Sequence, residues 1–185
     1  MNHPGFRPLR ESLQKDWEDS LTQQSVFLSK KGKTMPTPVK VFISYAHKDE
    51  RFKDELLAML ASLQRRKILK VWQDRQIEEG AEWYKAIQKA MNDCDIAILL
   101  VSQHFLGSQF IQKVEVPRLL RKRMRQGLRV VPIIVRPCLW QSEPVLKRLQ
   151  ALPKDGKPII SFPKGNGKRD QVWTDIAKAI EKRAK

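Results

Sequence analysis

Two patterns of hydrophobic and polar positions alternate along residues 39–183. Short runs of apolar and β-branched residues predict strands, and apolar residues spaced three or four apart predict amphipathic helices. Strands are expected at 39–43 (VKVFI), 68–72 (ILKVW), 95–102 (DIAILLVS), 129–135 (RVVPIIV) and 157–162 (KPIISF). Because a helical stretch follows each strand, the pattern predicts an α/β fold, a doubly wound parallel sheet of five strands with helices on both faces.

The helices are expected between these strands. Residues 49–66 hold the clearest apolar stripe, and further helices are predicted at 81–94, around Glu115, at 144–152 and at 169–183. The helix around Glu115 contains Pro117. Because proline has no backbone N–H, Pro117 must either start or kink this helix.

Residues 1–38 differ from the remainder of the chain. The stretch 11–28 would place Leu13, Trp17 and Leu21 on one side of a helix, and the following SKKGKTMPTP has the composition of a linker. We therefore expect an N-terminal extension and linker at 1–38, partly helical or disordered, and one folded domain at 39–185. Met35 lies just before that domain and is an alternative start of translation.

Charge is the most unusual property of the composition. The chain of 185 residues has 36 Lys and Arg against 20 Asp and Glu, a net charge of +16. Such an excess favours an anionic partner, which can be a nucleic acid, an acidic protein surface or a phosphorylated small molecule. A solvated basic surface would give the same composition, and no known nucleic-acid motif accompanies the charge.

Cysteine and hydropathy exclude several classes of protein. Cys94 and Cys138 match no metal-binding spacing and are too few for a disulfide framework, so we expect reduced thiols and no metal site. No apolar run is long enough to span a membrane, and the N-terminus lacks the apolar segment of a secretory signal. The expected location is the cytoplasm, with no membrane partner.

One carboxylate is conspicuous for its isolation. Glu115 is the only acidic residue between Asp95 and Glu143. It follows the loop at 102–109, one of three loops, with 44–50 and 74–80, at the carboxyl ends of the strands, where ligands bind in such sheets. Glu115 can therefore take part in chemistry, or it can pair with Arg118 on the same helix. No glycine-rich phosphate loop or nucleophile elbow follows any predicted strand.

Four segments in order, VFISYAHKDE, VWQDRQIEEGAEWYKAI, AILLVSQHFLGSQFIQKVE and VVPIIVRPCLW, resemble the TIR (Toll/interleukin-1 receptor) domain family. The similarity is greater to its bacterial members and covers residues 39 to about 183. The resemblance implies a flavodoxin-like sheet of five parallel strands. It also implies one of two functions, cleavage of NAD⁺ at the nicotinamide–ribose bond or assembly as a scaffold.

The resemblance further implies roles for particular residues. Members that cleave NAD⁺ use a glutamate on the third helix, and Glu115 matches that catalytic position. A carboxylate there would stabilise the positive charge that develops on the ribose. Many members have Trp four residues before this glutamate, where this chain has Ile111 next to Phe110. The implied substrate-binding residues are Ser44, Tyr45, Asp74, Arg75, Trp83, Ser102, Phe105, Ser108 and Phe110.

Some of these residues have simpler interpretations. Asp74 can be a turn or capping residue, Trp83 a core residue, and Ser108 the N-cap of the helix that contains Glu115.

Three hypotheses follow for the function. The first is a TIR-domain NAD⁺ glycohydrolase or cyclase in signalling or defence, which uses NAD⁺ as substrate, needs no other cofactor and acts after self-association. The second is a non-enzymatic adaptor that binds other TIR domains through the loop at 74–80. The third, motivated by the charge of +16, is a TIR protein that binds nucleic acid.

Overall fold

The computed structural model describes residues 37–72 and 81–185. Residues 38–185 form one compact unit. The helix expected within 11–28 and most of the expected linker lie outside the described residues.

A parallel sheet forms the centre of this unit. Its strands are β1 (Val39–Ser44), β2 (Leu69–Val71), β3 (Ile96–Val101) and β4 (Arg129–Ile134), in the order β2-β1-β3-β4. β1 and β3 pair from Val41 with Ile96 to Ser44 with Leu99. All residues of β3 are buried, as expected for a central strand covered on both faces. This is the parallel, doubly wound α/β fold that the alternating pattern predicts.

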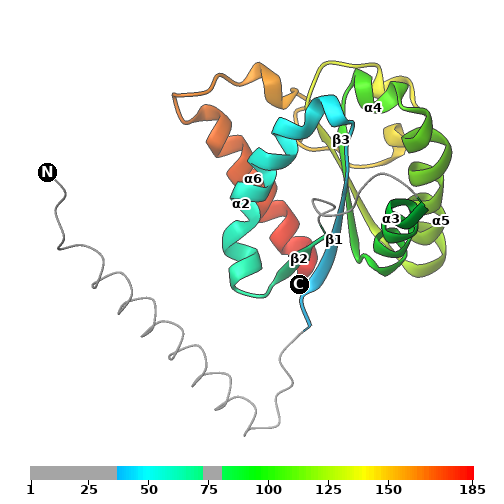
Figure 1. Cartoon of the computed structure of the whole chain (residues 1–185). Coiled ribbons are helices and arrows are strands. Elements are labelled where there is room, and N and C mark those ends of the chain that lie inside the picture. Colours follow the sequence, from blue (N-terminus) through cyan, green and yellow to red (C-terminus); the bar gives the residue numbers. More distant parts are fainter. Residues whose placement is uncertain (1–36, 73–80) are drawn as a thin grey trace, which may run out of the picture. The chain divides into compact units, whose positions relative to one another are not determined.

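Helices cover both faces of the sheet (Figure 1). On one side lie α2 (Glu50–Arg65) and α6 (Lys168–Ala184). On the other side lie α3 (Ala81–Asp93), α4 (Gln103–Gly107) and α5 (Val116–Gln126). The expected helices at 49–66, 81–94 and 169–183 are confirmed.

Short helical turns complete the unit. They are η1 (His47–Asp49), the π-helix η2 (Ile111–Glu115), η3 (Trp140–Ser142), η4 (Leu146–Arg148) and η5 (Ile159–Ser161). The helix expected at 144–152 is thus reduced to the single turn η4.

The fifth strand, expected at 157–162, is not found in the described part of the chain. The 3₁₀ turn η5 takes its place, preceded by Pro158 and followed, after Phe162, by Pro163. A proline nitrogen has no hydrogen to donate to a ladder, so prolines on both sides of the apolar run oppose a regular strand. The prediction of five strands is therefore corrected to four for the described residues.

Isolated backbone contacts replace the missing ladder beside β4. Ile133 forms a one-residue parallel bridge with Leu152. The N–H of Ile160 donates to the carbonyl of Val135 at 3.1 Å. These isolated contacts take the place of a fifth strand beside β4.

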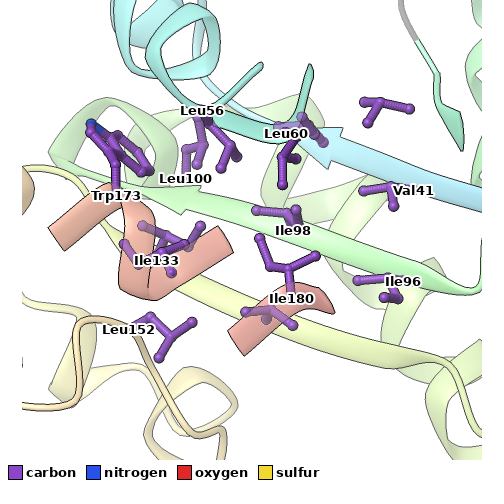
Figure 2. Close-up of a cluster of buried hydrophobic side chains, with 14 of the residues drawn as sticks. Val41, Leu56, Leu60, Ile96, Ile98, Leu100, Ile133, Leu152, Trp173 and Ile180 are labelled. Atoms are coloured by element: carbon purple, nitrogen blue, oxygen red, sulfur yellow. The ribbon is translucent and has the colours of Figure 1, made fainter. Parts of the chain in front are cut away.

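The layer between the sheet and helices α2 and α6 is apolar (Figure 2). Leu56 and Leu60 of α2 and Trp173 and Ile180 of α6 pack with Ile98 of β3 in one buried cluster. Helical spacing of four or seven residues places each pair on the face that meets the sheet.

A polar contact links the two helices of this layer. The indole nitrogen of Trp173 and Nε of Arg169 both donate to Oε2 of Glu55 at 2.9 Å, and Lys164 forms an ion pair with Oε1 at 2.8 Å. Burial by itself raises the pKa of Glu55. Hydrogen bonds from Lys164 and Trp173 and the charge of Arg169 outweigh this effect and hold the pKa below its usual range.

The helix that contains Glu115 changes its winding before Pro117. The N–H of Val116 bonds to the carbonyl of Ile111, five residues earlier, and α5 begins with Pro117 in its first turn. Pro117 cannot donate an N–H, and its ring would crowd the carbonyl of residue 113 in an α-helix, so the wider π turn relieves both problems. Because the backbone is helical without a break from residue 109 to residue 126, Pro117 does not start this helix, and the irregularity that it causes is the change from π to α winding inside the helix.

Candidate functional site

A pocket of about 610 Å³ lies where the chain leaves the carboxyl ends of the strands. Its volume is within the range of about 300–1,000 Å³ that is usual for small-molecule sites. The described residues that line it are Phe42, Ile43, Ser44, Tyr45, Ala46, His47, Lys48, Lys53, Leu57, Trp72, Ile87, Gln103, His104, Gly107, Ser108, Phe110, Ile111 and Glu115. The topology rule for parallel sheets therefore locates this pocket correctly.

Glu115 is a buried member of the pocket lining, with 5% of its surface exposed. The hydroxyl of Ser44, at the end of β1, donates a hydrogen bond to Oε2 of Glu115. The alternative partner Arg118 donates from Nε to Oδ1 of Asn92 at 3.0 Å. Burial and the bond to Ser44 distinguish Glu115 from a solvated acid on a helix surface.

Basic side chains form part of the pocket wall. His47 and Lys48 of η1 are exposed lining residues, whereas Lys53 of α2 is 6% exposed. Nζ of Lys53 donates to Oε1 of Glu50 at 2.8 Å and to the hydroxyl of Tyr45 at 3.3 Å. Burial lowers the pKa of Lys53, but these two bonds outweigh burial and raise it above the usual value. The ammonium is therefore charged at neutral pH.

Aromatic side chains form another part of the wall. Trp72 lies beside Phe42, with ring centroids 5.7 Å apart. Phe110 meets Tyr84 of α3 edge to face at 6.1 Å. Trp72 and Phe110 both line the pocket, so they can offer apolar faces to a planar ring.

The structure brings together five of the residues that the resemblance implies. Ser44, Tyr45, Ser108, Phe110 and Glu115 all line the pocket. Ser108 also accepts the N–H of Ile111 at 3.4 Å through its hydroxyl oxygen, so it acts as the N-cap considered as an alternative.

Two other predicted substrate-binding residues lie behind the pocket wall. Ser102 and Phe105 are fully buried at 0% exposure and are not among the described lining residues. Ser102 caps α4 by accepting the N–H groups of His104 and Phe105, each at 3.0 Å. Ser102 and Phe105 therefore flank the pocket from behind its wall, and their contact with substrate stays a prediction.

The remaining predicted residues cannot be placed in the site. Asp74 and Arg75 lie outside the described residues. Trp83 belongs to α3, but its side chain is also outside the described part.

Other lining residues were missed by the sequence analysis. Lys48, Lys53, Trp72 and His104 line the pocket, yet none was assigned to a site. Lys48, Trp72 and His104 follow the carboxyl ends of β1, β2 and β3. Their position after a strand could therefore have identified them as candidate pocket residues. Lys53 had no such signal, because it occupies a polar position of an amphipathic helix.

Metal and thiol chemistry find no support in the described residues. Across 37–72 and 81–185, no group of three or more His, Cys, Asp or Glu side chains could hold a metal ion. Burial raises the pKa of Cys94 to about 11 and also raises the pKa of Cys138, which disfavours reactive thiolates. No helix within the same ranges is long and apolar enough to cross a membrane.

These features define a doubly wound α/β domain with a ligand-sized pocket and a buried carboxylate at the carboxyl edge of its sheet. In a comparison with protein families, the model of the TIR domain matches residues 41–182. The chain therefore belongs to the TIR domain family.

A bacterial relative is also similar to this chain. The "Uncharacterized protein y4lF" of Sinorhizobium fredii is 37% identical over 144 residues, which make up 78% of this chain. They make up 43% of that protein, so the chain spans less than half the length of this relative.

Proposed function

We propose that this TIR domain cleaves NAD⁺ at the nicotinamide–ribose bond and releases nicotinamide with ADP-ribose or a cyclic isomer. The observation that supports the proposal most is the position of Glu115. This carboxylate is buried in a ligand-sized pocket at the functional edge of the sheet, and the hydroxyl of Ser44 fixes its orientation.

The chemistry requires one well-placed negative charge. When the bond between ribose C1′ and the pyridinium nitrogen breaks, both electrons leave with nicotinamide, which departs neutral and needs no general acid. Positive charge develops on the ribose, where the carboxylate of Glu115 would stabilise it. Water then adds to C1′ and loses a proton to give ADP-ribose, or a ring nitrogen of the adenine adds instead to give a cyclic product.

The walls of the pocket suit the other parts of NAD⁺. His47 and Lys48 present basic groups that can attract the diphosphate. Phe110 and Trp72 supply aromatic faces for the planar rings, and Phe110 stands next to the position where many family members have Trp. The proposal keeps Asp74, Arg75 and Trp83 as substrate-binding residues. It also places the protein in the cytoplasm, in signalling or defence, and makes activity dependent on self-association.

Nicotinamide release by the wild-type chain tests the proposal. We expect release from NAD⁺ whose specific rate increases with protein concentration or with a crowding agent, since self-association is part of the proposal. Chromatography of the products separates ADP-ribose from a cyclic isomer. Assembled protein that neither releases nicotinamide nor binds NAD⁺ would contradict the proposal and favour the non-enzymatic adaptor.

A second candidate, nucleic-acid binding, is favoured by the surface of α5. Arg118 donates to the side chain of Asn92 in α3, and Lys122 donates to the carbonyls of Asn92 and of Cys94, which directly follows α3. Three further arginines of α5 are exposed, at positions 121, 123 and 125. α5 itself contains no acidic residue, and its basic surface could contact a phosphate backbone.

Charge reversal on α5 tests this second candidate. If the surface binds duplex DNA, the double variant Arg121→Glu/Arg125→Glu should bind at least about tenfold more weakly and lower the log–log salt slope by about 2. Fluorescence anisotropy between low and moderate salt measures both. Lys178→Glu/Lys182→Glu on exposed positions of α6 is the control with the same charge change. Absence of wild-type binding at low salt, or equal losses in both variants, would contradict a site on α5.

A further inference from the structure

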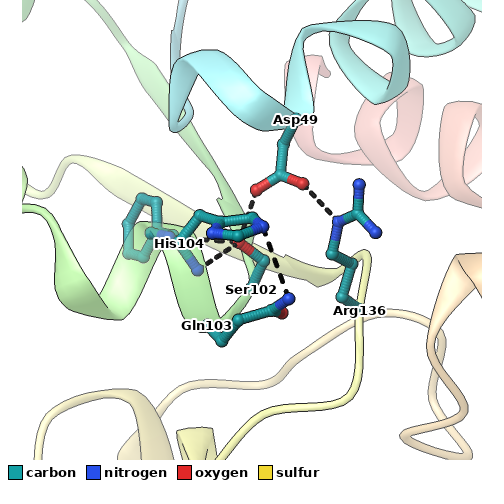
Figure 3. A network of polar contacts seen from close by, with 6 residues as sticks. Asp49, Ser102, Gln103, His104 and Arg136 are labelled. Carbon is teal, nitrogen blue, oxygen red and sulfur yellow. Dashed lines mark hydrogen bonds and ion pairs between the residues drawn. The ribbon is translucent and has the colours of Figure 1, made fainter.

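Figure 3 shows a buried carboxylate, that of Asp49, bonded to side chains from two other segments of the chain. Asp49 is the last residue of η1 and is 0% exposed. Its Oδ1 accepts a hydrogen bond from Nε of Arg136 at 2.6 Å, and its Oδ2 accepts one from the hydroxyl of Ser102. Asp49 therefore connects the segment after β1 with the segments that follow β3 and β4.

Ser102 links Asp49 to the start of α4 through hydrogen bonds. Its hydroxyl has one proton, which it donates to Asp49, and its oxygen accepts the backbone N–H groups of His104 and Phe105. The N-terminal turn of α4 is thus bonded to Asp49 through a single side chain.

Arg136 completes the network from the opposite side. Its guanidinium lies 5.3 Å from the ring centroid of Phe52, which is fully buried in α2. A guanidinium packed against an aromatic face and bonded to a carboxylate has little freedom to move. Asp49 is consequently held by partners from two separate segments.

The residues next to this network form two polar parts of the pocket wall. His47 and Lys48 line the pocket immediately before Asp49, and the first two residues of α4 line it immediately after Ser102. We propose that Asp49 is a positioning residue that fixes the separation of these two walls without touching substrate. Its effect on catalysis rests on the proposed NAD⁺ chemistry, whereas its effect on α4 does not.

Two acceptor oxygens on Asp49 are essential to this role. Both neighbours are donors toward it, so each carboxylate oxygen has one hydrogen bond to accept. An asparagine has one acceptor oxygen and one NH₂ group, and the NH₂ group would face either Ser102 or Arg136 donor to donor. Asp49→Asn therefore breaks one link while it preserves the size of the side chain.

The test compares Asp49→Asn with Asp175→Asn, a control at an exposed acid on α6. In Asp49→Asn we expect hydrogen exchange at the amides of His104 and Phe105 to be at least about tenfold faster, because their cap loses its anchor. We also expect KM for NAD⁺ to rise about tenfold or more while kcat stays within about threefold, since binding walls are disturbed and Glu115 is not. The control should match the wild type in both measurements.

Arg136→Gln provides a second variant, because Arg136 is partly exposed and its replacement disturbs the core less. We expect this variant also to speed hydrogen exchange at the amides of His104 and Phe105 and to raise KM for NAD⁺, each by a smaller factor than Asp49→Asn does. Wild-type exchange rates and KM in folded Arg136→Gln would overturn the proposal, even if Asp49→Asn does not fold. If the wild type releases no nicotinamide, the proposed NAD⁺ chemistry fails, and the exchange rates alone decide whether Asp49 holds α4.

Discussion

Replacing Glu115 by Gln is expected to lower the rate of nicotinamide release by about a thousandfold or more, because the substitution removes the negative charge that would stabilise the ribose cation. Glutamine has nearly the same shape and keeps a carbonyl oxygen that can accept the hydroxyl of Ser44, the partner of Glu115 in the pocket. The loss should therefore come from charge and not from a collapsed pocket. Nicotinamide release at saturating NAD⁺ measures the effect.

The matched control is Glu181→Gln. Glu181 is an acid of α6, the helix on the opposite side of the sheet from α4 and α5, and it forms ion pairs with Arg66 and Lys185. This variant should cleave NAD⁺ at the wild-type rate. A folded Glu115→Gln protein with wild-type activity would instead remove Glu115 from the chemistry.

Trp173→Ala is expected to reduce the free energy of unfolding by about 3–5 kcal/mol, the usual cost of truncating a large buried aromatic side chain. Trp173 is 1% exposed and packs between α6, α2 and the sheet (Figure 2). The variant also removes the indole donor to Glu55. Because whole domains are stable by only about 5–15 kcal/mol, the loss should be obvious in urea unfolding.

Two further variants separate the causes of this loss. Trp173→Phe keeps most of the apolar volume but removes the bond to Glu55, so it should lose less stability than Trp173→Ala. Met124→Ala truncates a side chain that is 86% exposed and should change stability by less than about 0.5 kcal/mol. A loss below about 1 kcal/mol for Trp173→Ala would contradict the described packing of α6.

Local sequence patterns could predict most elements of the fold. The continuous apolar run of β3 indicated a strand buried on both faces, and the stripes of α2 and α6 indicated helices that face the sheet. These signals are reliable because the period of side-chain direction is a property of the local backbone. The lack of an N–H in Pro117 likewise required a helix start or a kink, whatever the surroundings.

The same patterns could not predict whether a fifth strand pairs at the edge of the sheet. KPIISF at 157–162 has the apolar character of a strand, but a strand also needs a partner with matching backbone donors and acceptors. Beside β4, that pairing is limited to the bridge at Leu152 and the bond from Ile160 to Val135. Pairing depends on residues distant in sequence, so the apolar run alone was insufficient.

In the candidate site, too, the sequence predicted some properties of Glu115, and only the tertiary structure decided the others. The sequence determined that a lone carboxylate follows the third strand, and the rule for parallel sheets determined which edge it occupies. Only the tertiary structure decided that it is buried and bonded to Ser44, 71 positions away. It also decided that Ser102 bonds to Asp49 behind the wall instead of lining the pocket. The physical reason is that backbone periodicity acts over a few residues, whereas burial and hydrogen-bond partners are set by contacts between distant segments.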